Sequence, residues 1–109
     1  MNVVKYKELI LVPQEHRILA NKKDLKLSIK EYLILELFIK NPYKLYRDDE
    51  IFNKCWPENS ESMLKTVSVH ICNIRKQLKK HTKYPYIRNV IGVGYSLDIS
   101  ELDFNSLDF

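Results

Sequence analysis

Basic and hydrogen-bonding side chains share one segment of this 109-residue chain, between Lys65 and Lys80. Apolar residues recur within it at the spacing of one face of an α-helix: Val67, Ile71, Ile74 and Leu78. A second face carries short or hydrogen-bonding side chains: Thr66, Val69, His70, Asn73 and Gln77. Cations bracket that face: Lys65, Arg75, Lys76, Lys79 and Lys80. Such a helix suits the DNA major groove, where its front reaches base edges and its cations meet phosphates.

The alternative is an ordinary solvated surface helix, and the distribution of charge argues against it. No Asp or Glu occurs between Glu61 and Asp98, so none of the 14 acidic residues lies inside that interval. The interval contains these cations: Lys65, Arg75, Lys76, Lys79, Lys80, Lys83 and Arg88. Such segregation of charge is typical of proteins that bind a polyanion.

Catalytic or metal chemistry has little support in the sequence. The residues that could bind zinc do not have the spacing of a zinc site: Cys55, His70, Cys72 and His81. We expect Cys55 in the core and Cys72 at the edge of the polar helix face, with no pocket that would make it a nucleophile. The sequence therefore predicts no metal, no cofactor and no enzymatic activity.

Length and composition indicate one globular domain, with 45% hydrophobic residues and a net charge of only +4. The chain has two cysteines, and nothing in it resembles a signal peptide or a membrane-spanning run. We therefore expect a cytoplasmic protein with free thiols and no membrane contact within this chain.

Other elements must position the basic helix. Short strands are expected to form a small antiparallel sheet: Glu8–Val12, Arg17–Ala20 and Leu25–Leu27, with a turn at 21–24. Ser28 and Glu31 form a capping box that begins an apolar helix ending at Lys40. A shorter helix is expected at Asp48–Trp56.

A β-hairpin follows the basic helix. Tyr86–Val90 and Tyr95–Ile99 are expected to pair, with Gly92 and Gly94 supplying positive φ at the tip and Tyr95 packing the hairpin on the helix. The fold class is therefore α+β, a winged helix-turn-helix with an N-terminal sheet, three helices and a C-terminal wing. Residues 1–100 would form this domain, and residues 101–109 an acidic tail expected to be flexible.

Several motifs occur in a familiar order. The first are Leu27-Ser28-x-x-Glu31-Tyr32, Ile34-Leu35, Asn41-Pro42 and Cys55-Trp56. The more specific ones are Thr66-Val67-x-Val69-His70-Ile71-x-x-Ile74-Arg75-Lys76-x-Leu78 and Tyr86-Ile87-x-x-Val90-x-Gly92-x-Gly94-Tyr95. Over about residues 7 to 99, the chain resembles the OmpR/PhoB-type winged-helix DNA-binding domains of bacterial two-component response regulators.

The resemblance implies a four-stranded N-terminal sheet, a recognition helix at about 62–80 in the major groove, and a wing at about 86–99 near the adjacent minor groove. Base contacts would fall on Val69 and Asn73. Phosphate contacts would fall on Trp56, Lys65, Thr66, His70 and Arg75. Lys76 is included among the expected phosphate contacts because its side chain is positively charged. The wing residues would be Arg88, Asn89, Ile91, Gly92, Gly94 and Tyr95.

Some of these roles have alternatives. The Asn73 amide could pair with adenine or simply be solvated. Val69 could meet a thymine methyl group or pack beneath the wing. Trp56 could belong to the core alone or also reach a phosphate.

The resemblance further implies a transcription regulator that binds tandem sites upstream of promoters as a head-to-tail pair. RNA polymerase would be a candidate partner for the loop before the recognition helix: Pro57, Glu58, Asn59, Ser60 and Glu61. Departures from the family pattern at Ser68 and Asn73 predict a different target sequence. Ile91 stands where the wing commonly carries a minor-groove arginine.

We expect no receiver domain before Met1, and therefore no control by phosphorylation of an aspartate encoded in this chain. The chain could be a free-standing regulator, a fragment of a response regulator, or the DNA-binding part of a membrane-anchored ToxR/CadC-like regulator. A winged-helix module that binds proteins is the competing function, and Ile91 and the acidic tail keep it open.

Overall fold

A four-stranded antiparallel sheet begins the computed structural model, which describes residues 3–56 and 65–97. The strands follow chain order: β1 (Val4–Tyr6), β2 (Leu9–Val12), β3 (Arg17–Ala20) and β4 (Lys23–Asp24), with the 3₁₀ turn η1 (Pro13–Glu15) between β2 and β3. Alternate residues of the two central strands are fully buried: Leu9, Leu11, Ile18 and Ala20. One face of the sheet therefore belongs to the core.

The predicted strand at Leu25–Leu27 is wrong, because β4 comes earlier in the chain. Ala20 pairs with Lys23, so Asn21 and Lys22 alone form the turn. Their φ angles are 50° and 67°, the positive values that match a tight hairpin turn to the twist of its strands. Leu25 still donates its N–H to the Ile18 carbonyl oxygen of β3 at 2.9 Å, and its side chain is buried in the core.

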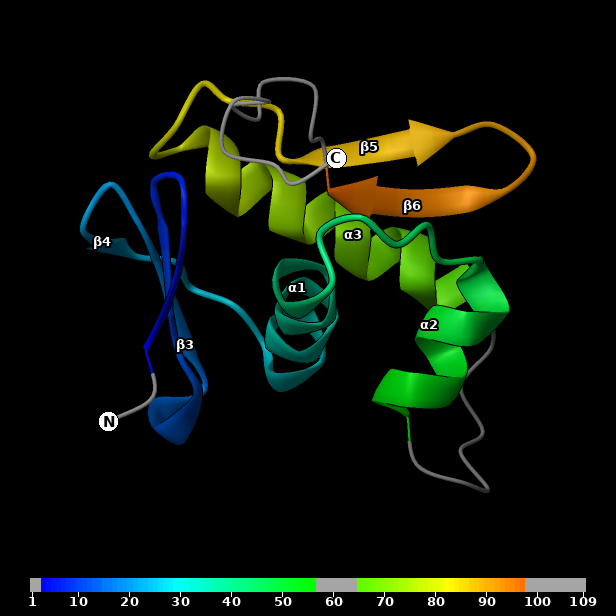
Figure 1. Cartoon of the computed structure of the whole chain (residues 1–109), viewed down its shortest axis with the longest axis horizontal. Coiled ribbons are helices and arrows are strands. Elements are labelled where there is room, and N and C mark those ends of the chain that lie inside the picture. The colour runs from blue at the N-terminus through cyan, green and yellow to red at the C-terminus, as the bar shows by residue number, and fades with distance from the viewer. Residues whose placement is uncertain (1–2, 57–64, 98–109) are drawn as a thin grey trace, which may run out of the picture.

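The central element is α1 (Ile29–Lys40), which lies between the sheet and the second helix, while the third helix crosses above it in this view (Figure 1). The predicted capping box is confirmed: Glu31 N donates to Ser28 Oγ at 3.3 Å, and Ser28 N donates to Glu31 Oε1 at 3.1 Å. Most sides of α1 are buried, through Tyr32, Ile34, Leu35, Phe38 and Ile39. The other elements pack around this helix.

The second and third helices are α2 (Asp48–Cys55) and α3 (Lys65–Lys79). The predicted apolar stripe of α3 is confirmed, since all four residues are buried: Val67, Ile71, Ile74 and Leu78. The segment that joins α2 to α3 lies outside the described residues, and so does the predicted start of the recognition helix at 62. No helix in the described ranges has the length and apolar character needed to cross a bilayer.

The wing consists of β5 (Ile87–Val90) and β6 (Gly94–Leu97), paired in the register Ile87 opposite Leu97 (Figure 1). Two backbone hydrogen bonds, together called the strap, join the wing to the α1–α2 connection. Tyr46 N donates to Tyr95 O and Tyr95 N donates to Tyr46 O, both at 2.8 Å. The predicted winged helix-turn-helix is confirmed, although the expected end of the second wing strand, Asp98 and Ile99, lies outside the described residues.

The two wing glycines have different roles, which corrects the expectation that both supply positive φ. Gly92 does so, with φ at 79°. Gly94 is the first residue of β6, and a Cβ there would overlap the carbonyl oxygen of Tyr46. Gly94 is therefore needed because two backbones approach closely at the strap.

A buried carboxylate joins α1 to α3. Glu31, only 6% exposed, uses its second oxygen, Oε2, to accept from His70 Nδ1 at 2.8 Å and from Asn73 Nδ2 at 3.3 Å. Burial alone would raise the pKa of Glu31, but the hydrogen bonds from His70, the Ser28 backbone and Asn73 outweigh it and hold the pKa below its ordinary value. Glu31 is therefore ionised and acts only as an acceptor.

The strap predicts unequal effects for the two glycines. Gly94→Ala should lower the free energy of unfolding by roughly 3 kcal/mol, because a rigid backbone blocks the added methyl group. Gly92→Ala should cost about 1 kcal/mol, since only its positive φ is unfavourable for alanine. Urea unfolding of both variants measures the difference, and equal losses would contradict the close approach at Tyr46.

Glu31→Gln keeps an oxygen that can cap α1 but removes the charge. At about pH 7 we expect a loss of about 2 kcal/mol of unfolding free energy, because hydrogen bonds to a charged acceptor are weakened. The folded-state pKa of Glu31 is lowered from 4.5, so this stability is present above that pH and disappears as the pH falls through the folded value. Urea unfolding curves of the two proteins should therefore converge as the pH is lowered below 4.5 and through the folded-state pKa of Glu31. A constant gap would exclude a role for the charge.

Candidate nucleic-acid interface

The solvent-facing side of α3 carries an exposed line formed by Val69, Cys72 and Lys76. Their spacing of i, i+3 and i+7 places them opposite the buried stripe. The Val69 side chain is 57% exposed, so the alternative that it packs beneath the wing is wrong. Cys72 is exposed next to Val69, on the side away from Asn73, which agrees with its expected place at the edge of the polar face.

The flank of α3 that faces α1 is fixed by Glu31. Because the ionised carboxylate cannot donate, His70 Nδ1 must carry the proton in their hydrogen bond. This leaves Nε2 as the ring nitrogen directed away from Glu31, on a side chain that is 24% exposed, and Nε2 can donate to a phosphate only in the imidazolium form, in which both ring nitrogens carry protons. The Asn73 amide donates one hydrogen bond to Glu31. Its Oδ1 and its second amide hydrogen remain, and these are the acceptor and donor that pair with an adenine edge.

The opposite flank of α3 is fixed by the wing. Arg75 Nη2 donates to the Ile87 carbonyl oxygen at 3.1 Å, and the guanidinium carbon lies 5.9 Å from the centre of the Tyr95 ring. The prediction that Tyr95 packs the wing against the helix is confirmed. Arg75 is thus a structural link as well as a predicted phosphate contact, and its other N–H groups remain for that contact.

Trp56 follows α2 and is only 8% exposed, so its place in the core is confirmed. Its ring stacks on Phe52 at 5.1 Å between centroids and meets the His70 ring at 5.6 Å. Lys30 Nζ lies 5.3 Å from the Trp56 ring centre and donates to the Cys55 carbonyl oxygen at 2.8 Å. A phosphate contact by Trp56 stays a prediction.

Sequence reasoning missed Lys30 and Glu31 as residues of this interface. Glu31 was recognised as a helix cap, but a capping box uses only one of its two carboxylate oxygens. The other oxygen is the signal that could have pointed to a further partner, because a buried carboxylate requires several donors. Lys30 gave no signal in the sequence, since its partners Cys55 and Trp56 are far away in the chain.

The cations from α3 to the wing make no ion pair with any carboxylate of the described residues. The exposed members of this group are Lys76, Lys79, Lys80, Lys83 and Arg88. Arg88 Nη2 lies 3.3 Å from Ser96 Oγ, to which it donates. Cations that no described carboxylate neutralises lie beside the exposed line of α3, so they leave positive charge for a polyanion.

The wing tip differs from the rest of this face. Ile91 is 94% exposed, and Asn89 is exposed as well. Two carboxylates from α2, Asp48 and Asp49, line a surface cavity together with residues 89–95. The tip is therefore apolar and uncharged, with acidic groups behind it.

Of the remaining predicted residues, Thr66 is half-buried and Lys76 is exposed. Lys65 begins α3, but its side chain lies outside the described part of the chain, and so does the predicted polymerase-facing loop from Pro57 to Glu61. Burial raises the pKa of the Cys55 thiol to about 11, which makes it unreactive near neutral pH. Within the described ranges, no group of three His, Cys, Asp or Glu side chains could hold a metal ion.

Comparison with known proteins gives a consistent result. The family model "Transcriptional regulatory protein, C terminal" matches residues 22–97. The alkaline phosphatase synthesis transcriptional regulatory protein SphR of Synechococcus elongatus is 35% identical over 96 residues, which are 87% of this chain and 37% of SphR. The chain thus spans less than half the length of this relative.

Two solved structures have the same fold. The DNA-binding domain of the response regulator AdeR, in complex with an intercistronic region, has a TM-score of 0.77 and 31% identity, covering 86% of this chain and 96% of that domain. The DNA-binding domain of Escherichia coli CadC has a TM-score of 0.78 and 26% identity, covering 90% and 92%. The chain therefore belongs to the transcriptional regulatory protein C-terminal family, the OmpR/PhoB-type winged-helix DNA-binding domains.

Proposed function

We propose that this chain is a sequence-specific, double-stranded DNA-binding regulator of transcription. Its α3 helix would enter the major groove, and its wing would lie beside the adjacent minor groove. The observation that carries this proposal is the exposed line of α3, fixed on both flanks and surrounded by cations that pair with no described carboxylate. The AdeR domain bound to an intercistronic region supports it.

Base recognition and phosphate binding are assigned to different residues. Val69 would contact a thymine methyl group and Asn73 an adenine edge, with Cys72 next to Val69 close to the bases. Phosphate contacts would come from Lys76, Arg75 and the protonated Nε2 of an imidazolium His70, together with the predicted residues Trp56, Lys65 and Thr66. With Ile91 at its tip, the wing would contribute contact area and the positive side-chain charge of Arg88 near the DNA phosphates, instead of minor-groove reading by arginine.

Further parts of the proposal follow from the resemblance to the family. The chain would bind tandem sites upstream of bacterial promoters as a head-to-tail pair, and the loop from Pro57 to Glu61 would face RNA polymerase. It would have no enzymatic activity and would act on the nucleoid in the cytoplasm. Residues 1–100 would form the DNA-binding domain and residues 101–109 an acidic tail, whether the chain stands alone or belongs to a response regulator or a CadC-like protein.

Selection of bound duplexes from a randomised pool, at near-physiological salt, tests the function directly. Enrichment of a repeated half-site spaced by about one helical turn is the expected result. Retention without an enriched sequence would leave only electrostatic binding and would overturn sequence-specific reading. No retention would favour the alternative, a winged-helix module that binds proteins.

Lys76→Ala should weaken binding to all duplexes by a similar factor. Removing one phosphate contact should also lower the slope of log affinity against log salt by about 0.9. Fluorescence anisotropy with the selected duplex and with a scrambled one, at several salt concentrations, measures both quantities. Lys26→Ala is the matched control, because Lys26 is exposed outside α3 and the wing. Equal changes in the slope for the two variants would refute the proposed contact.

Asn73→Ala should reduce discrimination at one base pair by about 1–3 kcal/mol while changing non-specific affinity little. The measurement is binding to the selected site and to duplexes with each single base replaced. Gln77→Ala, one turn further along the same flank of α3, is the control and should leave the preference at that base unchanged. If both variants lose affinity equally on every duplex, Asn73 does not read a base.

A further inference from the structure

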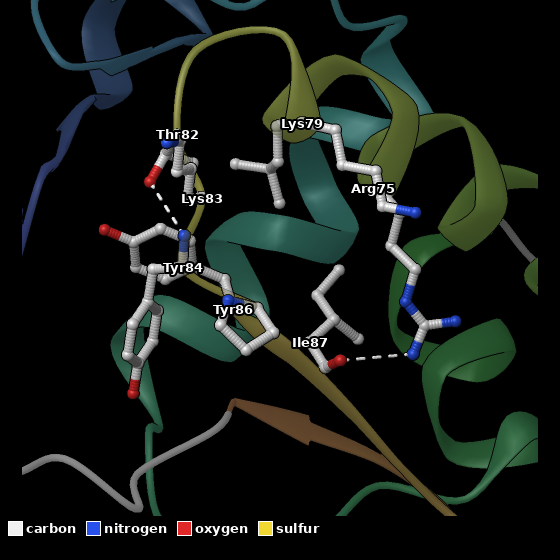
Figure 2. Close-up of a pocket in the computed structure, with 9 residues that line it drawn as sticks. Arg75, Lys79, Thr82, Lys83, Tyr84, Tyr86 and Ile87 are labelled. Carbon is white, nitrogen blue, oxygen red and sulfur yellow. Dashed lines mark hydrogen bonds between the residues drawn. The ribbon is translucent and has the colours of Figure 1, made fainter.

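A cavity of about 410 Å³ lies behind the C-terminal half of α3, between that helix, the following connector and the start of β5 (Figure 2). Leu78, Tyr84, Pro85, Tyr86 and Ile87 give it apolar and aromatic walls. It is separate from the exposed line of α3, because Leu78 belongs to the buried stripe on the other side of the helix.

The charged groups of this cavity are all positive. Arg75, Lys79 and Lys83 line it, and none of its lining residues is acidic. Lys79 and Lys83 are exposed, and neither forms an ion pair with a carboxylate of the described residues. An occupant that fits would combine carboxylates with large apolar side chains.

The chain itself contains such a segment next to the cavity. Leu97, the last residue of β6, pairs with Ile87, which is a wall residue, so the described part of the chain ends beside the cavity. Residues 98–109 contain no lysine or arginine. They carry the carboxylates Asp98, Glu101, Asp103 and Asp108 among the apolar residues Ile99, Leu102, Phe104, Leu107 and Phe109.

We propose that residues 98–109 bind this cavity within the same chain, with apolar side chains against its tyrosines and carboxylates at Arg75, Lys79 and Lys83. The reach is sufficient, because twelve extended residues span roughly 40 Å. A direct tether gives the segment a high effective concentration, so even weak contacts would hold it. The inference uses the cavity and the charges alone, and does not depend on DNA binding.

Paramagnetic relaxation in the full chain tests the proposal. A spin label at Ser106→Cys, in a Cys72→Ser background, would report the position of the segment, while Cys55 is buried and stays unlabelled. We expect the label to broaden amide signals of Lys79, Lys83 and Tyr84. The charge reversals Lys79→Glu and Lys83→Glu together should weaken docking on the order of tenfold and remove most of the broadening. Reversing Lys5 and Lys26, which are exposed elsewhere, is the matched control and should leave it intact.

A mixed sample distinguishes one chain from two. Isotope-labelled chain without a spin label, mixed with spin-labelled chain without isotope, should show no broadening at the cavity. Broadening in that mixture would mean that the segment of a second copy binds there, which overturns docking within one chain. Broadening centred on Val69 and Lys76, none at the cavity, or no effect of the Lys79 and Lys83 reversals would overturn it as well.

Discussion

The carboxylate of Glu31 is the interaction on which the arrangement of this domain most depends. One oxygen caps α1, and the other accepts from two residues of α3, so a single buried charge fixes both the start of the central helix and the angle at which α3 lies on it. A buried charge is costly unless its hydrogen-bonding capacity is filled. Here the partners are supplied by elements far apart in the chain, so the carboxylate is stable only when α1 and α3 are packed together.

The wing completes the support of α3 from the other side. Arg75 links the helix to the Ile87 carbonyl and the Tyr95 ring, and Tyr95 is tied in turn to the backbone of Tyr46. Both flanks of α3 are therefore held by hydrogen bonds before any ligand arrives, and its buried stripe is held by the core. Fixing a binding surface in advance reduces the entropy that must be lost on binding.

The sequence was sufficient for features that depend on local periodicity. The spacing of Val67, Ile71, Ile74 and Leu78 predicted which face of α3 is buried, and Ser28 with Glu31 predicted where α1 begins. It failed where contacts join distant residues. Neither the second role of Glu31 nor the approach of Gly94 to Tyr46 leaves a periodic pattern, and the positive φ of Asn21 and Lys22, which shifted β4, is not required by their residue types.

The exposed line of α3 has a consequence for how such a domain could diversify. Val69, Cys72 and Lys76 contribute little to the core, the cap or the strap, so exchanging them costs little folding free energy. The identities at these positions are thus decoupled from the scaffold, and new combinations of side chains could be tried there without unfolding the protein. The same fold could in this way support many different sets of exposed side chains, and each set could bind a different target.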